Sequence, residues 1–268
     1  MVANPGPAHV TSPVAPVTQQ LPKWVTLVRA PNPGPMTLDG TNTWVLRAGA
    51  GSAGAVVIDP GPDDEAHLRA VAELGPVAGI LVTHGHFDHT DGVERLRALT
   101  GAPLLPPTST RVAGLTITAL ATPGHTADSV CYLVHPDEDA TEQVVFTGDT
   151  ILGRGTTVVA WPDGDLGDYL ASLELLTAYR RLPALPGHGP ALADCGAAAA
   201  FYLAHRRARL EQVRAAVAAG ATTPSEVVDR IYTDVDPSLR AAAEWSVQAQ
   251  LAYLNREPSD HSQSLDQP

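Results

Sequence analysis

Four side chains that can bind a metal ion fall within six consecutive positions of this sequence: His84, His86, Asp88 and His89. An apolar run at residues 78–82 precedes them and predicts a buried strand, and a helical pattern follows at residues 91–99. The group therefore lies on a loop at the carboxyl end of a strand, where α/β proteins place reactive residues. Imidazoles and a carboxylate suit zinc and related first-row metals. Four donors at this spacing crowd a single ion, so the spacing predicts two adjacent ions.

Three more candidate donors each follow a glycine in the second half of the chain. His125 follows Pro-Gly, Asp149 follows an apolar stretch that ends in Gly, and His188 again follows Pro-Gly. Each of them alone would be interpreted as an ordinary core or turn residue. In this order, and with the first four, the seven residues resemble the ligand set of the metallo-β-lactamase-fold hydrolases.

The resemblance implies a fold and a set of roles. The fold is an αββα sandwich of two mixed sheets with the metals at one edge. Two Zn²⁺ ions share the seven ligands: His84, His86 and His125 hold one, Asp88, His89 and His188 hold the other, and Asp149 bridges them. A hydroxide between the ions is the implied nucleophile. Asp88 is the candidate catalytic residue, since it can also orient that hydroxide.

Two longer segments narrow the resemblance. Residues 32–43 and 148–157 are similar to the group that includes beta-lactamase-like protein 2, an endoribonuclease, and this similarity extends from about residue 25 to residue 255. Glyoxalase II, a thioester hydrolase with a helical C-terminal domain, shares the same ligands. Dedicated β-lactamases of this fold lack the bridging Asp, so Asp149 argues against a specialised lactamase while leaving a side activity open.

Three classes of function follow from these residues. The first is a metal-dependent hydrolase of small acyl compounds, such as thioesters, and it is slightly favoured. The alternative is an endoribonuclease that cleaves single-stranded RNA. A non-catalytic metal-binding protein is the third, and the complete ligand set disfavours it.

Charge supports the small-substrate interpretation. The chain has 17 Lys and Arg against 29 Asp and Glu, a net charge of −12, with a single lysine, Lys23. Nucleic-acid binding normally depends on a basic surface that displaces counterions. If RNA is a partner, the candidate contacts are Arg154 near the metal loop and a cluster of three, Arg206, Arg207 and Arg209.

The pattern of strands and helices predicts one layered α/β domain with an appendage. We expect a disordered leader at residues 1–21, a catalytic domain at 22–196, a helical, winged-helix-like appendage at 197–256 and a polar tail at 257–268. The appendage is predicted to contain helices and no strand. It is interpreted either as a packing module or dimer surface, or as a wall that faces the substrate or a nucleic acid.

Location and assembly follow from what the sequence lacks. No apolar run approaches the roughly 18 residues of a membrane span, and the first 21 residues do not have the pattern of a secretory signal. The two cysteines, Cys131 and Cys195, have no metal-binding or disulfide spacing. These features predict a cytoplasmic enzyme with no membrane partner, and a homo-oligomer stays open.

A few polar residues beside the seven donors have two interpretations each. Asp59, at the end of an apolar strand, is either a hydrogen-bond partner of a ligand imidazole or a structural residue of its Pro-Gly turn. Thr126 and Ser129 follow His125 and favour a turn or capping role over support of a ligand. Thr156 and Thr157 are candidates for the substrate entrance.

Overall fold

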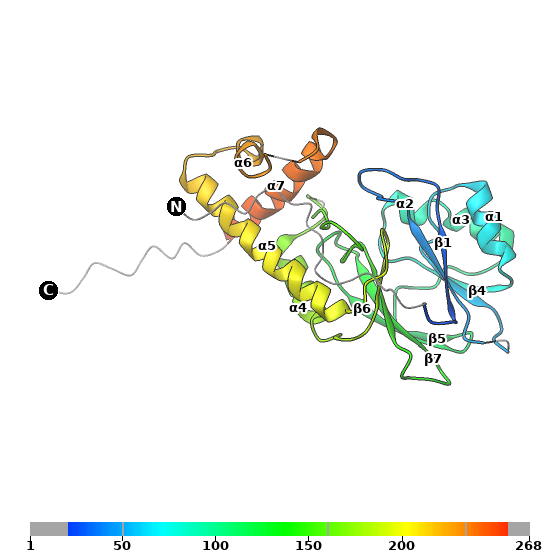
Figure 1. The fold of residues 1–268 in the computed structure, drawn as a ribbon. Helices are drawn as coiled ribbons and strands as arrows, with labels where there is room; N and C mark the ends of the chain where they lie inside the picture. The colour runs from blue at the N-terminus through cyan, green and yellow to red at the C-terminus, as the bar shows by residue number, and fades with distance from the viewer. Residues whose placement is uncertain (1–20, 50, 160, 234, 257–268) are drawn as a thin grey trace.

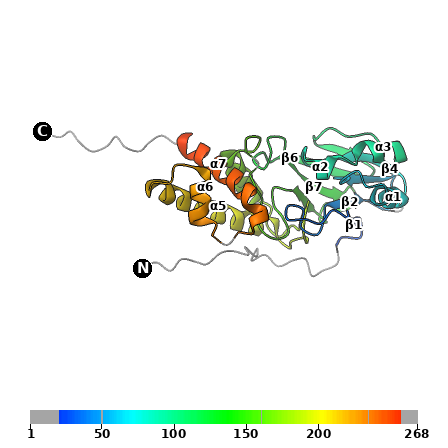
Figure 2. The ribbon, with the colours of Figure 1, turned by 90° about the horizontal axis from the view of Figure 1, so that it is seen from above.

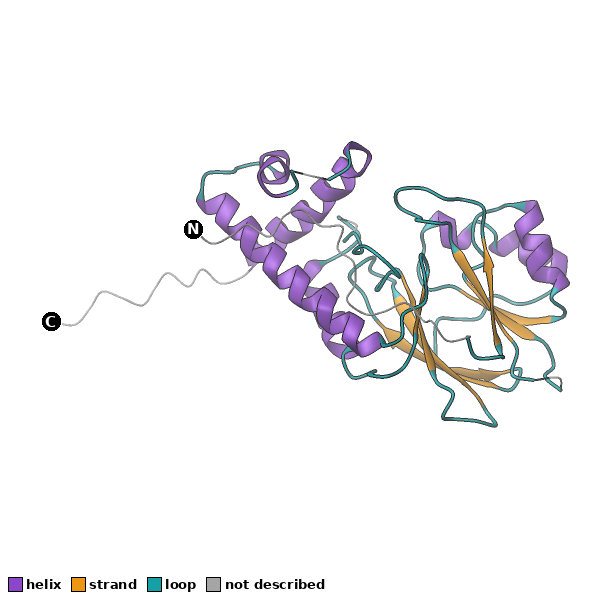
Figure 3. Cartoon of the chain, viewed as in Figure 1, coloured by secondary structure: helices purple, strands orange, loops and turns teal. Residues whose placement is uncertain are grey.

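The computed structural model describes residues 21–49, 51–159, 161–233 and 235–256. The predicted leader, apart from Leu21, and the predicted tail lie outside the described residues. Within the described part, the strands form two sheets that face each other (Figures 1 and 3). Helices lie on the outer sides of both sheets.

Each sheet mixes parallel and antiparallel pairs. The first, in spatial order, contains β1 (Val25–Arg29), β2 (Asn42–Leu46), β3 (Ala55–Ile58) and β4 (Val77–Leu81). The second contains β5 (Thr110–Val112), β6 (Leu115–Ala121), β7 (Val130–Pro136), β8 (Val144–Gly148) and β9 (Ala184–Pro186). The parallel pairs are β3 with β4 and β8 with β9. Because parallel neighbours need a crossover, α1 (Glu65–Glu73) and α4 (Leu166–Leu176) connect them.

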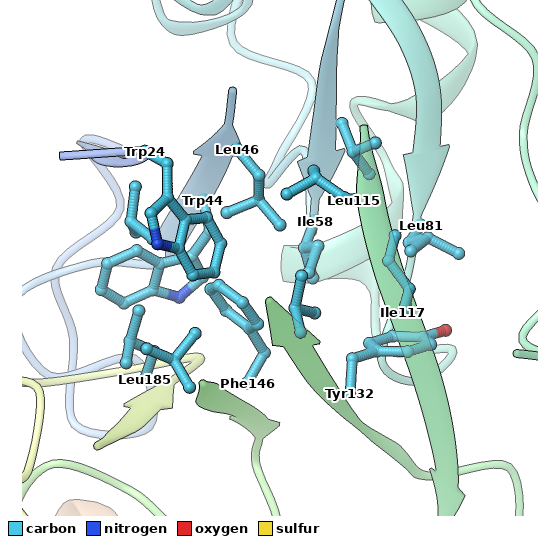
Figure 4. Close-up of a cluster of buried hydrophobic side chains, with 14 residues drawn as sticks. Trp24, Trp44, Leu46, Ile58, Leu81, Leu115, Ile117, Tyr132, Phe146 and Leu185 are labelled. Atoms are coloured by element: carbon cyan, nitrogen blue, oxygen red, sulfur yellow. The ribbon is translucent and has the colours of Figure 1, made fainter. Parts of the chain in front are cut away.

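Alternation along the strands builds the core between the sheets. In β3, Val56 and Ile58 face the second sheet, while Val57 faces the helices on the other side. Side chains of both sheets meet in this core, and the rings of Trp44 and Phe146 pack edge to face with centroids 5.8 Å apart (Figure 4). This core fixes the two sheets relative to each other, and with them the loops at their edges.

Helices cover the outer face of each sheet. On the first sheet, Leu68 of α1 and Leu96 of α3 (Val93–Thr100) pack on Val57 and Ile80. On the second, α4 and the first half of α5 (Cys195–Ala218) pack on residues such as Val145. Figure 2 shows α1 and α3 on one side of the strands and α5 on the other. The predicted αββα sandwich is confirmed.

The C-terminal appendage has a hydrophobic core of its own. It contains the second half of α5, α6 (Pro224–Ile231), a short 3-10 helix η1 (Pro237–Leu239) and α7 (Arg240–Arg256). Thr223 is the N-cap of α6 and forms a capping box with Glu226. Val213, Val227 and Val247 pack together between the helices. No strand occurs in the described residues of this appendage, in agreement with the predicted helical unit.

No helix in the described ranges is both long enough and apolar enough to cross a membrane. The cytoplasmic location and the oligomeric state stay predictions.

Candidate metal centre

The loop after β4 positions the first four candidate donors. The strand ends at Leu81, and the one-turn helix α2 (Phe87–Thr90) begins two residues after Gly85 with His86 as its N-cap. The helix α2 therefore includes two of the four donors, Asp88 and His89. The sequence pattern had predicted helix only after the motif, at residues 91–99. Its single turn brings a donor atom of His89 to within 4.8 Å of one of His84 and places Asp88 beside His89.

The other three donors come from turns at the ends of β6, β8 and β9. His125 lies between β6 and β7, Asp149 follows β8 directly, and His188 lies two residues after β9. Gly187 is required at its position: a Cβ there would approach Asp149 Oδ1 to 2.5 Å and His89 Cε1 to 2.6 Å. The absence of a side chain at Gly187 therefore keeps the space between these donors open.

The structure brings all seven predicted side chains into one cluster. Two groups of three, each with donor atoms within 4.8 Å of one another, are His84, His86 and His125, and Asp88, His89 and His188. In the first group, Nδ1 of His86 lies 3.0 Å from His84 Nε2 and 3.1 Å from His125 Nε2. In the second, His188 Nε2 lies 3.3 Å from His89 Nε2 and 3.1 Å from Asp88 Oδ2.

Asp149 lies between the two groups. Its Oδ2 atom is 3.8 Å from His125 Nε2 and 3.4 Å from His188 Nε2, and its Oδ1 atom is 3.5 Å from His89 Nε2. The Oδ1 atom is buried and has no hydrogen-bond partner. A buried carboxylate oxygen without a partner is costly in a folded protein, and a bound cation would satisfy it. The donor set therefore fits a metal centre.

Groups behind the cluster orient the imidazoles. Asp59 accepts hydrogen bonds from the backbone N–H and the hydroxyl of Thr83, at 2.7 and 2.8 Å, and its Oδ2 atom lies 2.9 Å from His89 Nδ1. Nδ1 of His125 lies 2.6 Å from the carbonyl oxygen of Val158. Such partners fix the ring orientation and the tautomer, so Nε2 of His89 and Nε2 of His125 are directed into the cluster. Of the two interpretations of Asp59, the ligand-orienting one agrees with these contacts.

The remaining candidates have other partners. Thr126 and Ser129 hydrogen-bond to each other at 2.7 Å, and Thr126 also binds Asp128, as expected for turn residues. Thr157 is buried, and its hydroxyl donates to the carbonyl oxygen of Asp149 at 2.6 Å. The prediction that Thr157 lines the substrate entrance is therefore wrong. Its side chain points into the protein and holds the backbone of Asp149 by a hydrogen bond.

Charge divides the cluster into two sides. Burial lowers the pKa of His84 and of His125, so both imidazoles are held in the neutral form that binds metals. Burial also lowers the pKa of His188, but the carboxylates of Asp149 and Asp88 outweigh this effect and raise it to about 10. Burial raises the pKa of Asp149, yet His188 and His89 hold it well below its ordinary value. A proton on His188 thus compensates the negative charge of Asp88 and Asp149. A bound cation would replace that proton.

The cluster opens to solvent on the side of α2. His89, His125 and His188 are buried, whereas the side chain of Asp88 is 28% exposed. Phe87, between two of the donors in sequence, is 78% exposed. Solvent therefore reaches the cluster on the side of α2.

The arginines proposed as RNA contacts do not form a free basic surface. Arg154 forms an ion pair with Asp39, and Arg207 forms one with Glu174. Arg209 donates to the carbonyl oxygen of Ile231 at 2.9 Å and stacks on the Tyr232 ring. The fourth, Arg206, is 5% exposed. The prediction of a basic cluster on this helix is wrong, because successive helical positions point in different directions and each guanidinium finds a local partner.

Comparison with known proteins decides the family. Residues 36–117 match the family model of the metallo-beta-lactamase superfamily, and residues 223–257 match that of the beta-lactamase associated winged helix domain. An atrochrysone carboxyl ACP thioesterase of Aspergillus chevalieri is 34% identical over 252 residues, which cover 83% of this chain and 78% of that protein. The chain belongs to the metallo-beta-lactamase superfamily.

Two further proteins are similar to this chain, one in sequence and one in fold. A beta-lactamase-like protein 2 homolog of Caenorhabditis elegans is 29% identical over 253 residues, covering 84% of this chain and 82% of that protein. The structure of a metallo-beta-lactamase family protein from Thermus thermophilus superposes with a TM-score of 0.70 at 24% identity, covering 89% of this chain and 95% of that one. Members of the metallo-beta-lactamase superfamily are hydrolases, which confirms the predicted enzyme class.

Proposed function

We propose that this chain hydrolyses acyl thioesters with the help of two zinc ions bound by the seven clustered side chains. The observation that carries the two-ion proposal is the position of Asp149. Its carboxylate lies within 3.8 Å of His125 in one group of donors and 3.4 Å of His188 in the other. A carboxylate between two donor groups, with one buried oxygen free of hydrogen bonds, supports a bridging role.

The proposed ligands divide as the clustered groups do. One ion would be held by His84, His86 and His125, the other by Asp88, His89 and His188, with Asp149 shared. Imidazole and carboxylate donors are those that zinc prefers. Two such ions act as Lewis acids that polarise a carbonyl group and make water nucleophilic at neutral pH.

We assign proton transfer to Asp88. Its side chain is 28% exposed, against 11% for Asp149, so it is the more accessible of the two carboxylates in the cluster. A water molecule that enters from the α2 side would meet Asp88 first. The carboxylate of Asp88 can accept a proton from that water and orient it towards the thioester carbonyl.

Charge and similarity support a thioester over RNA. The net charge is −12, and the arginines proposed as RNA contacts are paired or buried. A polyanion would therefore meet few free cations near the site. The similar protein of Aspergillus chevalieri is named a thioesterase.

Cleavage of single-stranded RNA is the second candidate. It is supported by similarity along most of the chain to a beta-lactamase-like protein 2 homolog, together with the endoribonuclease activity that the sequence resemblance implies for that group. The same metal cluster could stabilise charge at phosphorus as well as at a carbonyl.

The test compares three substrates with one zinc-loaded preparation: a small S-acyl thioester, a chromogenic β-lactam and a single-stranded RNA oligonucleotide. We expect the highest kcat/KM for the thioester and a weak or absent rate for the other two. An Asp149→Ala chain purified in the same way controls for contaminating hydrolases. Efficient RNA cleavage with negligible thioester hydrolysis would replace the first candidate with the second.

A further inference from the structure

The loop between β8 and α4 touches the metal cluster at two points. Asp149 lies at its start, and the carbonyl oxygen of Val158 binds His125 Nδ1 at 2.6 Å near its end. Thr157 connects the two points, because its hydroxyl donates to the carbonyl oxygen of Asp149 at 2.6 Å. The position of this loop therefore determines where one candidate shared ligand and one imidazole ligand lie.

Residues 149–158 contain no helix or strand, so other elements must hold them. Tyr169 of α4 donates its hydroxyl to the carbonyl oxygen of Thr150 at 2.7 Å. Tyr202 of α5 donates to the carbonyl oxygen of Gly155 at 2.9 Å and lies 3.2 Å from the backbone nitrogen of Leu152. Both tyrosines are fully buried, and these bonds are therefore shielded from solvent.

Arg206 completes the contacts from α5. Its guanidinium donates to the carbonyl oxygen of Thr157, and its Cζ atom lies 5.4 Å from the centre of the Tyr169 ring. The side chain is 5% exposed, its Nε atom has no hydrogen-bond partner, and no carboxylate pairs with it among the described residues. Burial of a guanidinium without a carboxylate is costly, so the hydrogen bond to Thr157 has to offset part of that cost.

The place of Arg206 on α5 connects the two parts of the molecule. The first half of this helix packs on the second sheet, and the second half packs on α6 and α7 (Figure 1). Arg206 lies near the middle of the helix, where it reaches the metal loop from the side of the appendage.

We propose that Arg206 is a positioning residue for the metal centre, which holds Thr157 so that the Asp149 carboxylate and the Val158 carbonyl keep the positions that the ligands need. The inference rests on the proposed function only in requiring that the cluster binds divalent metal ions. Arg206 contacts neither of the two donor groups itself and acts through Thr157.

The experiment compares three variants: Arg206→Met, Arg206→Lys and the control Arg207→Met. Arg207 is the next residue of the same helix, but it is exposed and pairs with Glu174 on the surface. Zinc affinity is measured by competition with a chromogenic chelator, and the Co²⁺-substituted chains are compared by their visible absorption. Circular dichroism and thermal unfolding of the metal-free chains report on the fold.

We expect Arg206→Met to bind zinc about 10- to 100-fold more weakly than the wild-type chain, as removal of a group that supports a ligand typically does. Its Co²⁺ spectrum should change, while its circular dichroism matches that of Arg207→Met. Arg206→Lys should recover part of the affinity, because an ammonium can still donate to Thr157. A folded Arg206→Met chain with the affinity and spectrum of Arg207→Met would overturn the proposal.

Two safeguards keep the test decisive. If Arg206→Met does not fold, Arg206→Lys and Thr157→Val take its place, and unchanged zinc affinity in both would overturn the proposal. Zinc affinity is measured without a substrate. A wild-type chain that binds zinc but does not hydrolyse thioesters would therefore contradict the proposed substrate without contradicting the role of Arg206. A wild-type chain that binds no divalent ion contradicts the metal centre before any variant is compared.

Discussion

The carboxylate of Asp59 lies 2.9 Å from Nδ1 of His89, although 30 positions separate the two residues in sequence. Asp59 follows β3 with a positive φ of 53°, and its side chain and the His89 ring are both buried. The same carboxylate binds the backbone of Thr83, one residue before the metal motif. Asp59 therefore holds the start of the loop that carries the first four donors, and it also sets the orientation of the His89 ring.

Replacing Asp59 by Asn tests this relationship. The amide keeps the shape of the side chain, but one of its two oxygens becomes an N–H₂ group that cannot accept a hydrogen bond. We expect zinc affinity and kcat/KM to fall about 10- to 100-fold, as for other partners of ligand imidazoles. Asp63→Asn, an exposed position in the same segment, is the matched control. Equal zinc affinity in the two variants would show that Asp59 serves only its turn.

Asp149→Ala tests the shared carboxylate. Since Asp149 is the protein group that we assign to both ions, its removal should lower the zinc content from about two ions per chain to about one and reduce kcat more than about 100-fold. The hydrophobic core does not include Asp149, so circular dichroism should be unchanged. Metal analysis and steady-state kinetics make the comparison. Retention of two ions with near-normal turnover would be incompatible with bridging.

Salt dependence separates thioester from RNA. Each phosphate contact in single-stranded RNA would give a slope of about −0.7 in log affinity against log salt. Because Arg207 already pairs with Glu174, we expect Arg207→Glu to leave thioester turnover within about twofold of wild type and to reveal no steep salt effect. Binding of labelled RNA between low and moderate salt is the measurement. Tight RNA binding that falls steeply with salt, and that Arg207→Glu abolishes, would support the nuclease instead.

His205 makes the fold sensitive to acid. Burial and the neighbouring Arg206 and Arg209 lower its folded-state pKa to about 4 from the ordinary value of 6.5. His205 therefore binds a proton more readily in the unfolded chain than in the folded one. The free energy of unfolding is unaffected by this difference above pH 6.5 and decreases as the pH falls from 6.5 towards 4. We expect His205→Gln to unfold with a weaker dependence on pH in that window. The wild type and variant are compared by urea unfolding at several pH values, and identical slopes would refute the assignment.

Much of the candidate site could be predicted because its seven donors lie in short local motifs. The strand, turn and ligand of the His84–His89 segment adjoin in sequence, and each later donor follows a glycine. The ring partners were harder to predict, since Val158 acts through its backbone carbonyl and leaves no trace in its side-chain type. Strands of three residues, such as β5 and β9, are too short to show the alternation of apolar and polar residues from which a strand is predicted.

Arg206 shows where adjacency in sequence misleads. Its position next to Arg207 and near Arg209 predicts one basic cluster. The buried positions of α5 recur at spacings of three and four, through Tyr202, Arg206 and Leu210. That spacing would have placed Arg206 on the buried face. The loop that Arg206 contacts depends on how α5 packs on the sandwich. The amino-acid composition and the hydrophobic periodicity of the helix do not specify that packing.

Titration of zinc into the metal-free chain, with bound metal and thioester hydrolysis followed together, shows how many ions the reaction needs. We expect hydrolysis to rise until two zinc ions are bound per chain and then to stay constant. Hydrolysis that is already complete with one ion bound, or that never appears at two, would contradict a dinuclear thioester hydrolase.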